Sequence, residues 1–182
     1  MVHSFRKRES LYQKGQHPYG RRSGEGEDYW RSIGSNVAYK MDHIRRNMVK
    51  RSKPVYCLSF DLELEGHVEM EIASCVPYTY SNLKNTMDSL SLPSLETVTC
   101  EYSVLCKSLA GIDVPLITIN NPPLDQVDPP NFLILNARTH PGEASSSWVI
   151  DGLMRELTQS SEVLEQLQEH RIVLKIVPML NS

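Results

Sequence analysis

The sequence predicts an α+β protein in which an antiparallel, sandwich-like β-domain precedes the first, truncated βαβ part of an α/β domain. Alternating polar and apolar residues before position 120 are typical of half-buried strands. Residues 121–130 are rich in proline and form the best linker candidate in the chain. Beyond them, two continuous apolar runs enclose helical patterns, which is typical of parallel strands joined by a crossover. We therefore expect a β-rich domain over 29–120 and the start of an α/β domain over 131–182.

The composition is that of an ordinary globular protein. The chain has 182 residues, of which 40% are hydrophobic and 23% charged, enough for one domain or two small ones. No run approaches the roughly 20 apolar residues of a membrane helix, and the first residues are too polar for a signal peptide. We therefore expect a cytoplasmic protein with no membrane partner. The four cysteines lack the spacing of a zinc ribbon and the density of a disulfide scaffold, so we expect free thiols.

Charge is distributed unevenly along the chain. Residues 1–53 carry 13 lysines and arginines against 5 acidic residues, a net +8, whereas residues 54–182 carry 6 against 17, a net −11. Residues 1–28 are rich in glycine and arginine and have no apolar period, so we expect a basic, disordered arm. Such an arm would attract an acidic protein tail by long-range electrostatics. Nucleic acid is not expected as a partner, because the basic residues lack regular aromatic neighbours.

Alternation is strictest in residues 56–64, and a second alternating run follows over 68–76. A three-residue loop, 65–67, would join the two runs as a hairpin that brings their hydrophobic faces together and sets Cys57 opposite Cys75. The outer face would then carry four carboxylates, which we interpret as a solvated surface rather than a cation site: Asp61, Glu63, Glu69 and Glu71.

Further elements are expected on both sides of the linker. Ser81 should cap a helix that ends before Pro93, and strands should follow over 98–104 and 116–119. After the linker the pattern predicts, in order, an apolar strand 132–135, helices 143–157 and 163–167, and a second apolar strand 172–179. Parallel sheets of this kind present their ligands at the carboxyl ends of the strands.

The chain contains one His-x-x-Glu sequence, His140 to Glu143, at the carboxyl end of the first of these parallel strands. Zinc accepts an imidazole nitrogen and a carboxylate oxygen, and a turn containing proline and glycine can bring both toward one point. A catalytic zinc has three protein ligands, so a third would have to come from elsewhere. His170 is expected at the opposite end of the sheet and His67 in a hairpin loop of the other domain, so neither is expected to be that ligand. The alternative interpretation is that Glu143 simply favours the start of a helix.

Four blocks of the sequence, in the same order, resemble the cytosolic carboxypeptidase family of zinc peptidases. Residues 135–143 with 147–149 resemble the segment that opens the catalytic domain of that family, and 175–181 resemble the strand that follows it. Residues 77–81 and 105–111 are similar to its amino-terminal β-domain. Residues 29–34 match the start of that domain more loosely, so the resemblance covers about residues 29–181.

The resemblance implies a zinc metallocarboxypeptidase, a hydrolase that cleaves carboxy-terminal peptide bonds and removes glutamate from tubulin or other acidic tails. His140 and Glu143 would be the first two zinc ligands, and Zn²⁺ the cofactor. Water activated by the metal would be deprotonated by a glutamate acting as general base. By the same resemblance, the protein would be cytoplasmic and associated with microtubules.

The sequence departs from the family after Asn181. There the family continues with Pro-Asp-Gly, the arginine and asparagine that bind the substrate carboxylate, the second zinc histidine and the general-base glutamate. None of these follows in this chain, so the resemblance assigns no catalytic residue to it. We expect an amino-terminal fragment with an incomplete zinc site that is inactive alone. The alternative is a non-enzymatic binding module that docks onto acidic protein tails, and an RNA-associated protein ranks last.

The same truncation should affect folding of the second domain. Parallel strands need burial on both faces and at their edges, which two strands and one crossover cannot supply. We therefore expect the chain after residue 130 to aggregate or be mobile unless a partner covers it. The exposed residues would be Phe132, Ile134, Ile172, Leu174 and Ile176.

Overall fold

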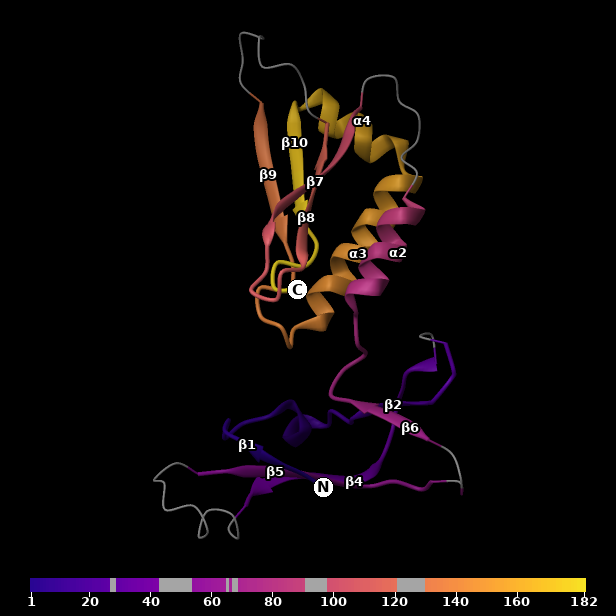
Figure 1. Ribbon diagram of the computed structural model, residues 1–182, viewed down its shortest axis with the longest axis vertical. Helices are drawn as coiled ribbons and strands as arrows, with labels where there is room; N and C mark the ends of the chain where they lie inside the picture. The colour runs from indigo at the N-terminus through magenta and orange to yellow at the C-terminus, as the bar shows by residue number, and fades with distance from the viewer. Residues whose placement is uncertain (27–28, 43–53, 65, 67–68, 91–97, 121–129) are drawn as a thin grey trace. The chain divides into compact units, whose positions relative to one another are not determined.

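The computed structural model describes residues 1–26, 29–42, 54–64, 66, 69–90, 98–120 and 130–182. These residues form two compact units, Met1–Val76 and Pro77–Ser182, which Figure 1 shows in indigo to magenta and in magenta to yellow. Across the described ranges, no helix is both long enough and apolar enough to cross a membrane. Each unit has its own sheets and its own buried residues.

The first unit consists of two three-stranded antiparallel sheets and a short 3-10 helix. Tyr39 and Tyr56 stack with ring centroids 5.7 Å apart and, with Leu58, form its buried core. The first sheet has the strand order β1 (Val2–Phe5), β5 (Tyr56–Asp61), β4 (Ser35–Met41). The second has the order β3 (Arg31–Ser32), β2 (Tyr19–Arg22), β6 (Met70–Ala73), and the 3-10 helix η1 spans Leu11–Lys14.

The basic segment 1–28 differs from the disordered arm that its composition suggested, because it contributes β1, η1 and β2 to the first unit. Phe5 and Tyr12 pack against the core, and the Tyr39 hydroxyl donates to the Lys7 carbonyl at 2.6 Å. Widely spaced aromatic residues therefore anchor a segment whose overall composition is polar. The basic side chains Arg6, Lys7 and Arg8 remain exposed on its surface.

The predicted hairpin between residues 56–64 and 68–76 is wrong. β5 pairs with β1 and β4, β6 pairs with β2, and Cys57 lies opposite Lys40 instead of Cys75. The proposed loop residues 65 and 67 lie outside the described residues. Across the β2–β6 ladder, Glu71 forms an ion pair with Arg21 at 2.6 Å, which is compatible with this pairing but too exposed to decide it. The four cysteines are free thiols, as predicted.

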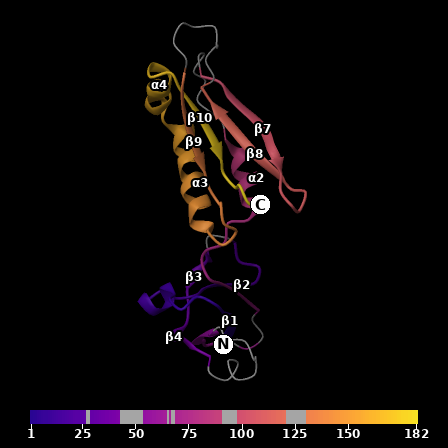
Figure 2. The ribbon, with the colours of Figure 1, turned by 90° about the vertical axis from the view of Figure 1, so that its left-hand side faces the viewer.

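The second unit is a mixed four-stranded sheet with the order β7-β8-β10-β9. Its strands are β7 (Cys100–Lys107), β8 (Asp113–Ile119), β9 (Asn131–Asn136) and β10 (Ile172–Val177). Its helices are α2 (Tyr80–Ser89), α3 (Ala144–Gln159) and α4 (Ser161–Glu169), and Figures 1 and 2 show them along one face of the sheet. β9 and β10 pair in parallel through α3 and α4, so the predicted βαβ unit is confirmed.

Two boundaries differ from the expected ones. α2 is capped by Thr79, whose side chain accepts a hydrogen bond from the Asn82 amide, two residues before the expected cap at Ser81. The compact units divide at Val76–Pro77, whereas the sequence suggested a division at the proline-rich linker 121–130. Most of that linker lies outside the described residues, and the strands on its two sides, β8 and β9, both pair with β10 in one sheet.

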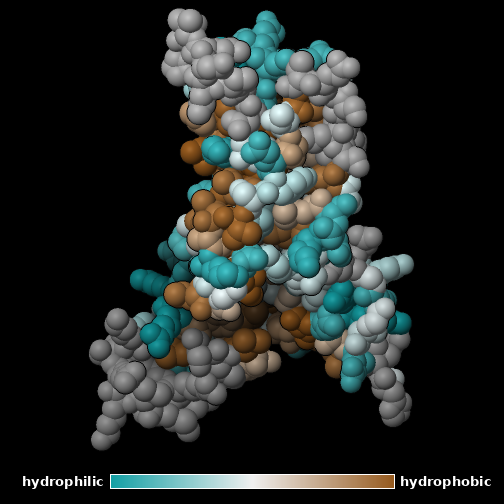
Figure 3. Space-filling model, turned by 45° about the horizontal axis from the view of Figure 1, so that its top comes forward, coloured by the Kyte–Doolittle hydropathy of each residue, from teal (hydrophilic) through white to brown (hydrophobic). Residues whose placement is uncertain are grey.

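The strand β9 is an open edge of this sheet. Phe132 is 58% exposed and Ile134 65%, as expected, but Leu174 and Ile176 are 3% and 0% exposed. The difference follows from the strand order, because β10 lies between β8 and β9 and is covered by the helices. Figure 3 shows hydrophobic residues gathered on the side of the unit where β9 lies. Unpaired apolar edges of this kind recruit other strands.

We predict that the chain self-associates with rising concentration through β9, and that Ile134→Glu weakens this association. The new carboxylate would lie opposite Lys175 in the β9–β10 ladder, so it should charge the edge without unfolding it. Sedimentation velocity over a concentration series measures the effect. Val149→Glu is the matched control, because Val149 is 70% exposed on α3 and away from the edge. Equal association of the two variants would contradict the prediction.

Candidate metal centre

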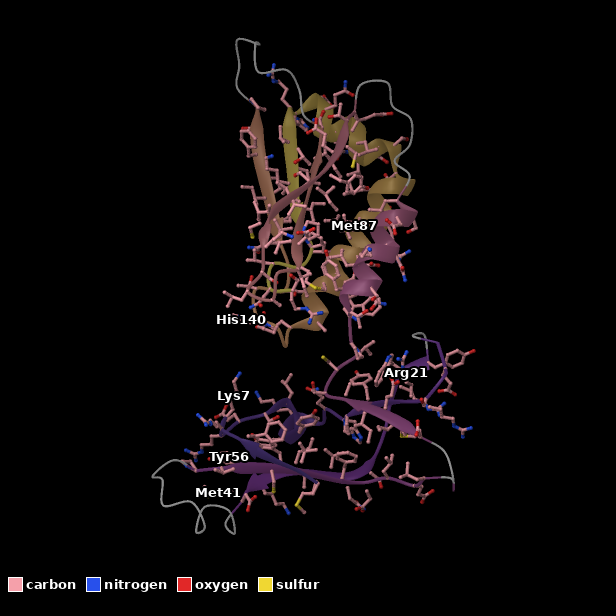
Figure 4. All side chains as sticks on the ribbon, in the orientation of Figure 1. Lys7, Arg21, Met41, Tyr56, Met87 and His140 are labelled. Atoms are coloured by element: carbon pink, nitrogen blue, oxygen red, sulfur yellow. The ribbon has the colours of Figure 1, made fainter. Side chains whose placement is uncertain are left out.

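The turn between β9 and α3 carries the residues that the sequence singled out as metal ligands. β9 ends at Asn136 and α3 begins at Ala144, so His140 lies in the loop that follows the strand. Because β9 runs parallel to β10, this loop lies at the carboxyl ends of both strands. Figure 4 labels His140 at this end of the sheet. The position is the one at which parallel sheets place their ligands.

The backbone of the turn is closed by short-range hydrogen bonds. The Glu143 amide donates to the His140 carbonyl at 3.1 Å, and the Ser146 hydroxyl donates to the Glu143 carbonyl at 2.8 Å. The first bond closes a β-turn with Pro141 and Gly142 at its centre, which are residues that favour turns. His140 and Glu143 are therefore held at the two ends of one tight turn.

The two side chains meet each other at the surface. The His140 Nδ1 atom lies 3.0 Å from the Glu143 Oε1 atom, and the side chains are 74% and 57% exposed. Glu143 is the residue that precedes α3, yet its carboxylate makes no capping hydrogen bond to the helix. Its place directly before α3 is also the place at which a negative charge favours the start of a helix, so the zinc-ligand and helix-start interpretations both fit this position. The geometry brings an imidazole and a carboxylate together at a solvent-accessible point.

These two groups match part of a zinc ligand set. Imidazole nitrogen and carboxylate oxygen are both zinc ligands, and a catalytic zinc takes three protein ligands and leaves one position for water. Within the described residues, no group of three or more histidine, cysteine, aspartate or glutamate side chains could hold a metal ion. The turn thus fits a zinc ion with two of the three protein ligands.

The other histidines considered from the sequence do not join this pair. His170 is the C-cap residue of α4 and lies two residues before the start of β10, so it lies near the amino end of that strand. A six-residue strand spans about 20 Å, which separates His170 from the carboxyl-end turn. His67 is outside the described residues.

A buried polar network lies behind the turn, and the sequence analysis missed it. The Asp151 carboxylate on α3 accepts hydrogen bonds from Tyr78 Oη at 2.8 Å, Thr86 Oγ1 at 2.5 Å and Arg155 Nε at 2.7 Å. Asp151 is 4% exposed. It shares the buried stripe of α3 with Ser147 and Met154 at helical spacing, so an acidic residue on an apolar stripe was the available signal.

The network fixes the protonation states of its members. Burial alone would raise the pKa of Asp151, but hydrogen bonds from Arg155, Thr86 and Tyr78, with the charge of Arg155, bring that pKa below its ordinary value of 3.8. Burial and the hydrogen bond to Asp151 raise the pKa of the Tyr78 hydroxyl, which therefore remains a proton donor at neutral pH. The result is a charged carboxylate with three donors, which joins α3 to α2 through Thr86 and to the segment before α2 through Tyr78.

The sequence is similar to those of known carboxypeptidases. No protein-family model matches the chain. It is 32% identical over 161 residues to cytosolic carboxypeptidase 2 of Danio rerio and 33% identical over 170 residues to cytosolic carboxypeptidase 4 of Mus musculus. These matches cover 87% and 86% of the chain. They cover 21% and 15% of the relatives, so the chain spans about a fifth of their length or less.

The fold is similar to that of solved bacterial enzymes. A metallo-carboxypeptidase from Burkholderia cenocepacia superposes on 93% of the chain with a TM-score of 0.63 and 18% sequence identity. The chain corresponds to 39% of that structure. At this level of identity the comparison establishes the fold alone.

We predict that Asp151→Asn lowers stability at neutral pH by about 1–3 kcal/mol, because an amide cannot replace a carboxylate that accepts three hydrogen bonds. The lowered pKa fixes the sign of the pH dependence. The contribution of Asp151 is complete above its ordinary pKa of 3.8 and is lost as pH falls through the lower folded-state value. Urea unfolding followed by circular dichroism between pH 7 and pH 3 measures both effects.

The expected result is that the stability gap between parent and Asp151→Asn narrows at the acidic end. Glu156→Gln provides the control, since Glu156 lies exposed on the same helix. A constant gap across the whole pH range would show that the charge of Asp151 is not what stabilises this unit.

Proposed function

Because the chain belongs to the cytosolic carboxypeptidase family, we propose that His140 and Glu143 are two ligands of a catalytic zinc ion in a metallocarboxypeptidase site. The supporting observation is the 3.0 Å contact between their side chains, in a turn at the carboxyl end of β9. The reaction class is hydrolysis of carboxy-terminal peptide bonds. When bound, zinc supplies a Lewis acid for that hydrolysis.

The contribution of this chain is to present two ligands in a fixed arrangement. The hydrogen-bonded turn restricts the backbone between His140 and Glu143. Metal binding therefore costs little further conformational entropy in this segment. The contact between Nδ1 and Oε1 orients the imidazole and the carboxylate toward each other before binding. Both groups are exposed, which leaves room for a further ligand and for a substrate.

We propose acidic carboxy-terminal protein tails, including those of tubulin, as the substrate class, with removal of glutamate as the activity. The exposed side chains Arg6, Lys7 and Arg8 on the first unit support this substrate, since clustered cations attract acidic peptides over distances of about a Debye length. The names of the relatives, cytosolic carboxypeptidases, support the cytosol as the location, and we propose association with microtubules there.

We propose further that the 182-residue chain is inactive by itself. Two ligands without a third leave the ion mostly bound to water, and the described residues place no other carboxylate or histidine beside the pair as a general base. A binding module for acidic tails is the second candidate function. The exposed cations of the first unit favour it, because they need no metal to attract an acidic peptide.

We predict weak zinc binding that depends on both residues of the pair. In calorimetric titrations, His140→Ala and Glu143→Gln should each remove the binding heat, because one remaining ligand cannot retain the ion against water. His170→Ala is the matched control and should titrate like the parent, since His170 lies at the other end of the sheet. The zinc-loaded parent should release no glutamate from a glutamate-ended peptide.

Three outcomes would contradict these proposals. Retention of zinc by His140→Ala would exclude the ligand role. Loss of zinc in His170→Ala would move the site to the other end of the sheet. Release of glutamate by the parent above the level of the His140→Ala variant would show that a complete catalytic set exists in the chain.

A further inference from the structure

Arg138 joins three separate segments of the second unit. Its Nη1 atom donates to the Pro141 carbonyl at 2.7 Å, Nη2 to the Tyr78 carbonyl at 2.5 Å, and Nε to Ser147 Oγ at 3.3 Å. Pro141 belongs to the ligand turn, Ser147 to the first turn of α3, and Tyr78 to the segment before α2. The planar guanidinium, with five donors in a fixed fork, suits three acceptors in different directions.

The backbone of Arg138 also has an unusual conformation, which hydrogen bonds to neighbouring segments hold in place. Its φ angle is 54°, in the left-handed region that residues other than glycine rarely adopt. Its amide donates to Ser146 Oγ at 2.9 Å, and its carbonyl accepts from the Asn181 amide at 3.0 Å. The unusual conformation is therefore stabilised on both sides and directs the guanidinium back over the turn that follows.

Tyr78 is a rigid anchor for this contact. Its side chain is 4% exposed, and its ring meets the Trp148 ring edge-on with centroids 4.9 Å apart. Its hydroxyl donates to Asp151 at 2.8 Å, and Asp151 in turn accepts from Thr86 on α2. The Tyr78 carbonyl is thus held by the buried network, so a bond to it fixes the position of Arg138.

The ligand pair itself lacks such support. His140 and Glu143 are exposed, and the contacts that their side chains make among the described residues are with each other. From outside the turn, Asn181 Nδ2 donates to the Thr139 carbonyl at 3.5 Å and Ser146 Oγ donates to the Glu143 carbonyl at 2.8 Å, one at each end of the turn. Arg138 Nη1 donates to the Pro141 carbonyl at 2.7 Å, at the centre of the turn between His140 and Glu143. The Arg138 side chain is therefore the restraint on the part of the backbone that lies between the two ligands.

We propose that Arg138 is a positioning residue for the His140–Glu143 pair, and that it acts by fastening the ligand turn to the Tyr78 carbonyl. This inference rests on the proposed metal role of the pair. Arg138 is a positioning residue and not a catalytic one, because its Nη1, Nη2 and Nε atoms donate to Pro141, Tyr78 and Ser147. Groups that orient metal ligands typically change metal affinity by about 10- to 100-fold when they are removed.

Arg138→Gly isolates the side chain, because glycine adopts a φ angle of 54° without strain and the backbone bonds can persist. Arg138→Lys retains the charge but presents one ammonium group, which cannot reach three divergent acceptors. The matched control is Lys84→Met. It removes a cation from an exposed position on α2 in the same unit and keeps the hydrogen bonds of Arg138 and of the Asp151 network.

The first measurement uses the metal-free chain of 182 residues. Hydrogen exchange followed by NMR reports the Glu143 and Ser146 amides, which bond the His140 and Glu143 carbonyls. Arg138→Gly and Arg138→Lys should each accelerate both amides by about tenfold relative to the parent, as loss of local hydrogen bonds opens the turn. Lys84→Met should leave them at the parent rate. Equal exchange in the parent and Arg138→Gly overturns the positioning role, as does equal acceleration in Lys84→Met.

The second measurement is a zinc titration followed by the ring signals of ¹⁵N-labelled histidine. The zinc affinity reported by His140 should fall about tenfold or more in Arg138→Gly and stay at the parent value in Lys84→Met. Unchanged affinity in Arg138→Gly overturns the positioning role alone. A parent chain in which the His140 ring does not respond to zinc overturns the ligand role on which it rests, so the two failures are distinguishable.

Discussion

The parallel pairing of β9 with β10 is the constraint on which the candidate site depends. The register runs from Asn131 opposite Ile172 to Asn136 opposite Val177, so the two strands end together. The chain leaving β9 then turns into α3, and the chain leaving β10 passes beside that turn. Backbone bonds record this passage: the Ala137 amide donates to the Val177 carbonyl, and the Leu180 amide donates to the Ala137 carbonyl, both at 2.9 Å. A turn that follows an isolated strand would have no such neighbour.

The site combines exposed chemistry with a buried scaffold. His140 and Glu143 face solvent, whereas Tyr78 and Asp151 behind them are 4% exposed each. A charged carboxylate with three donors is costly to misplace, so the network specifies how α2 packs on α3. Arg138 links the turn to this network, because its guanidinium donates to the Tyr78 carbonyl as well as to the Pro141 carbonyl. The candidate ligands His140 and Glu143 lie on a loop, and the helices and strands around that loop fix their positions.

Local signals predicted the βαβ part of the second unit well, but not that α2, β7 and β8 belong to the same unit, and they predicted the first unit poorly. The βαβ unit follows from continuous apolar strands around helical spacing, and the His-x-x-Glu motif lies within eight residues of β9, so both could be predicted without knowing distant contacts. The hairpin prediction failed because alternation defines a strand but not its partner: β6 pairs with β2, whose Arg21 lies 50 residues before Glu71 in the sequence. Arg138, Tyr78 and Asp151 were not identified as a set, because their contacts span 60 and 73 residues of sequence.

The central claim is that His140 and Glu143 bind one zinc ion at the end of β9. The most direct test is anomalous diffraction at the zinc absorption edge from crystals of the chain soaked in zinc. We predict an anomalous peak about 2 Å from one ring nitrogen of His140 and from a carboxylate oxygen of Glu143. A zinc peak elsewhere on the chain, with none at this turn, would contradict it.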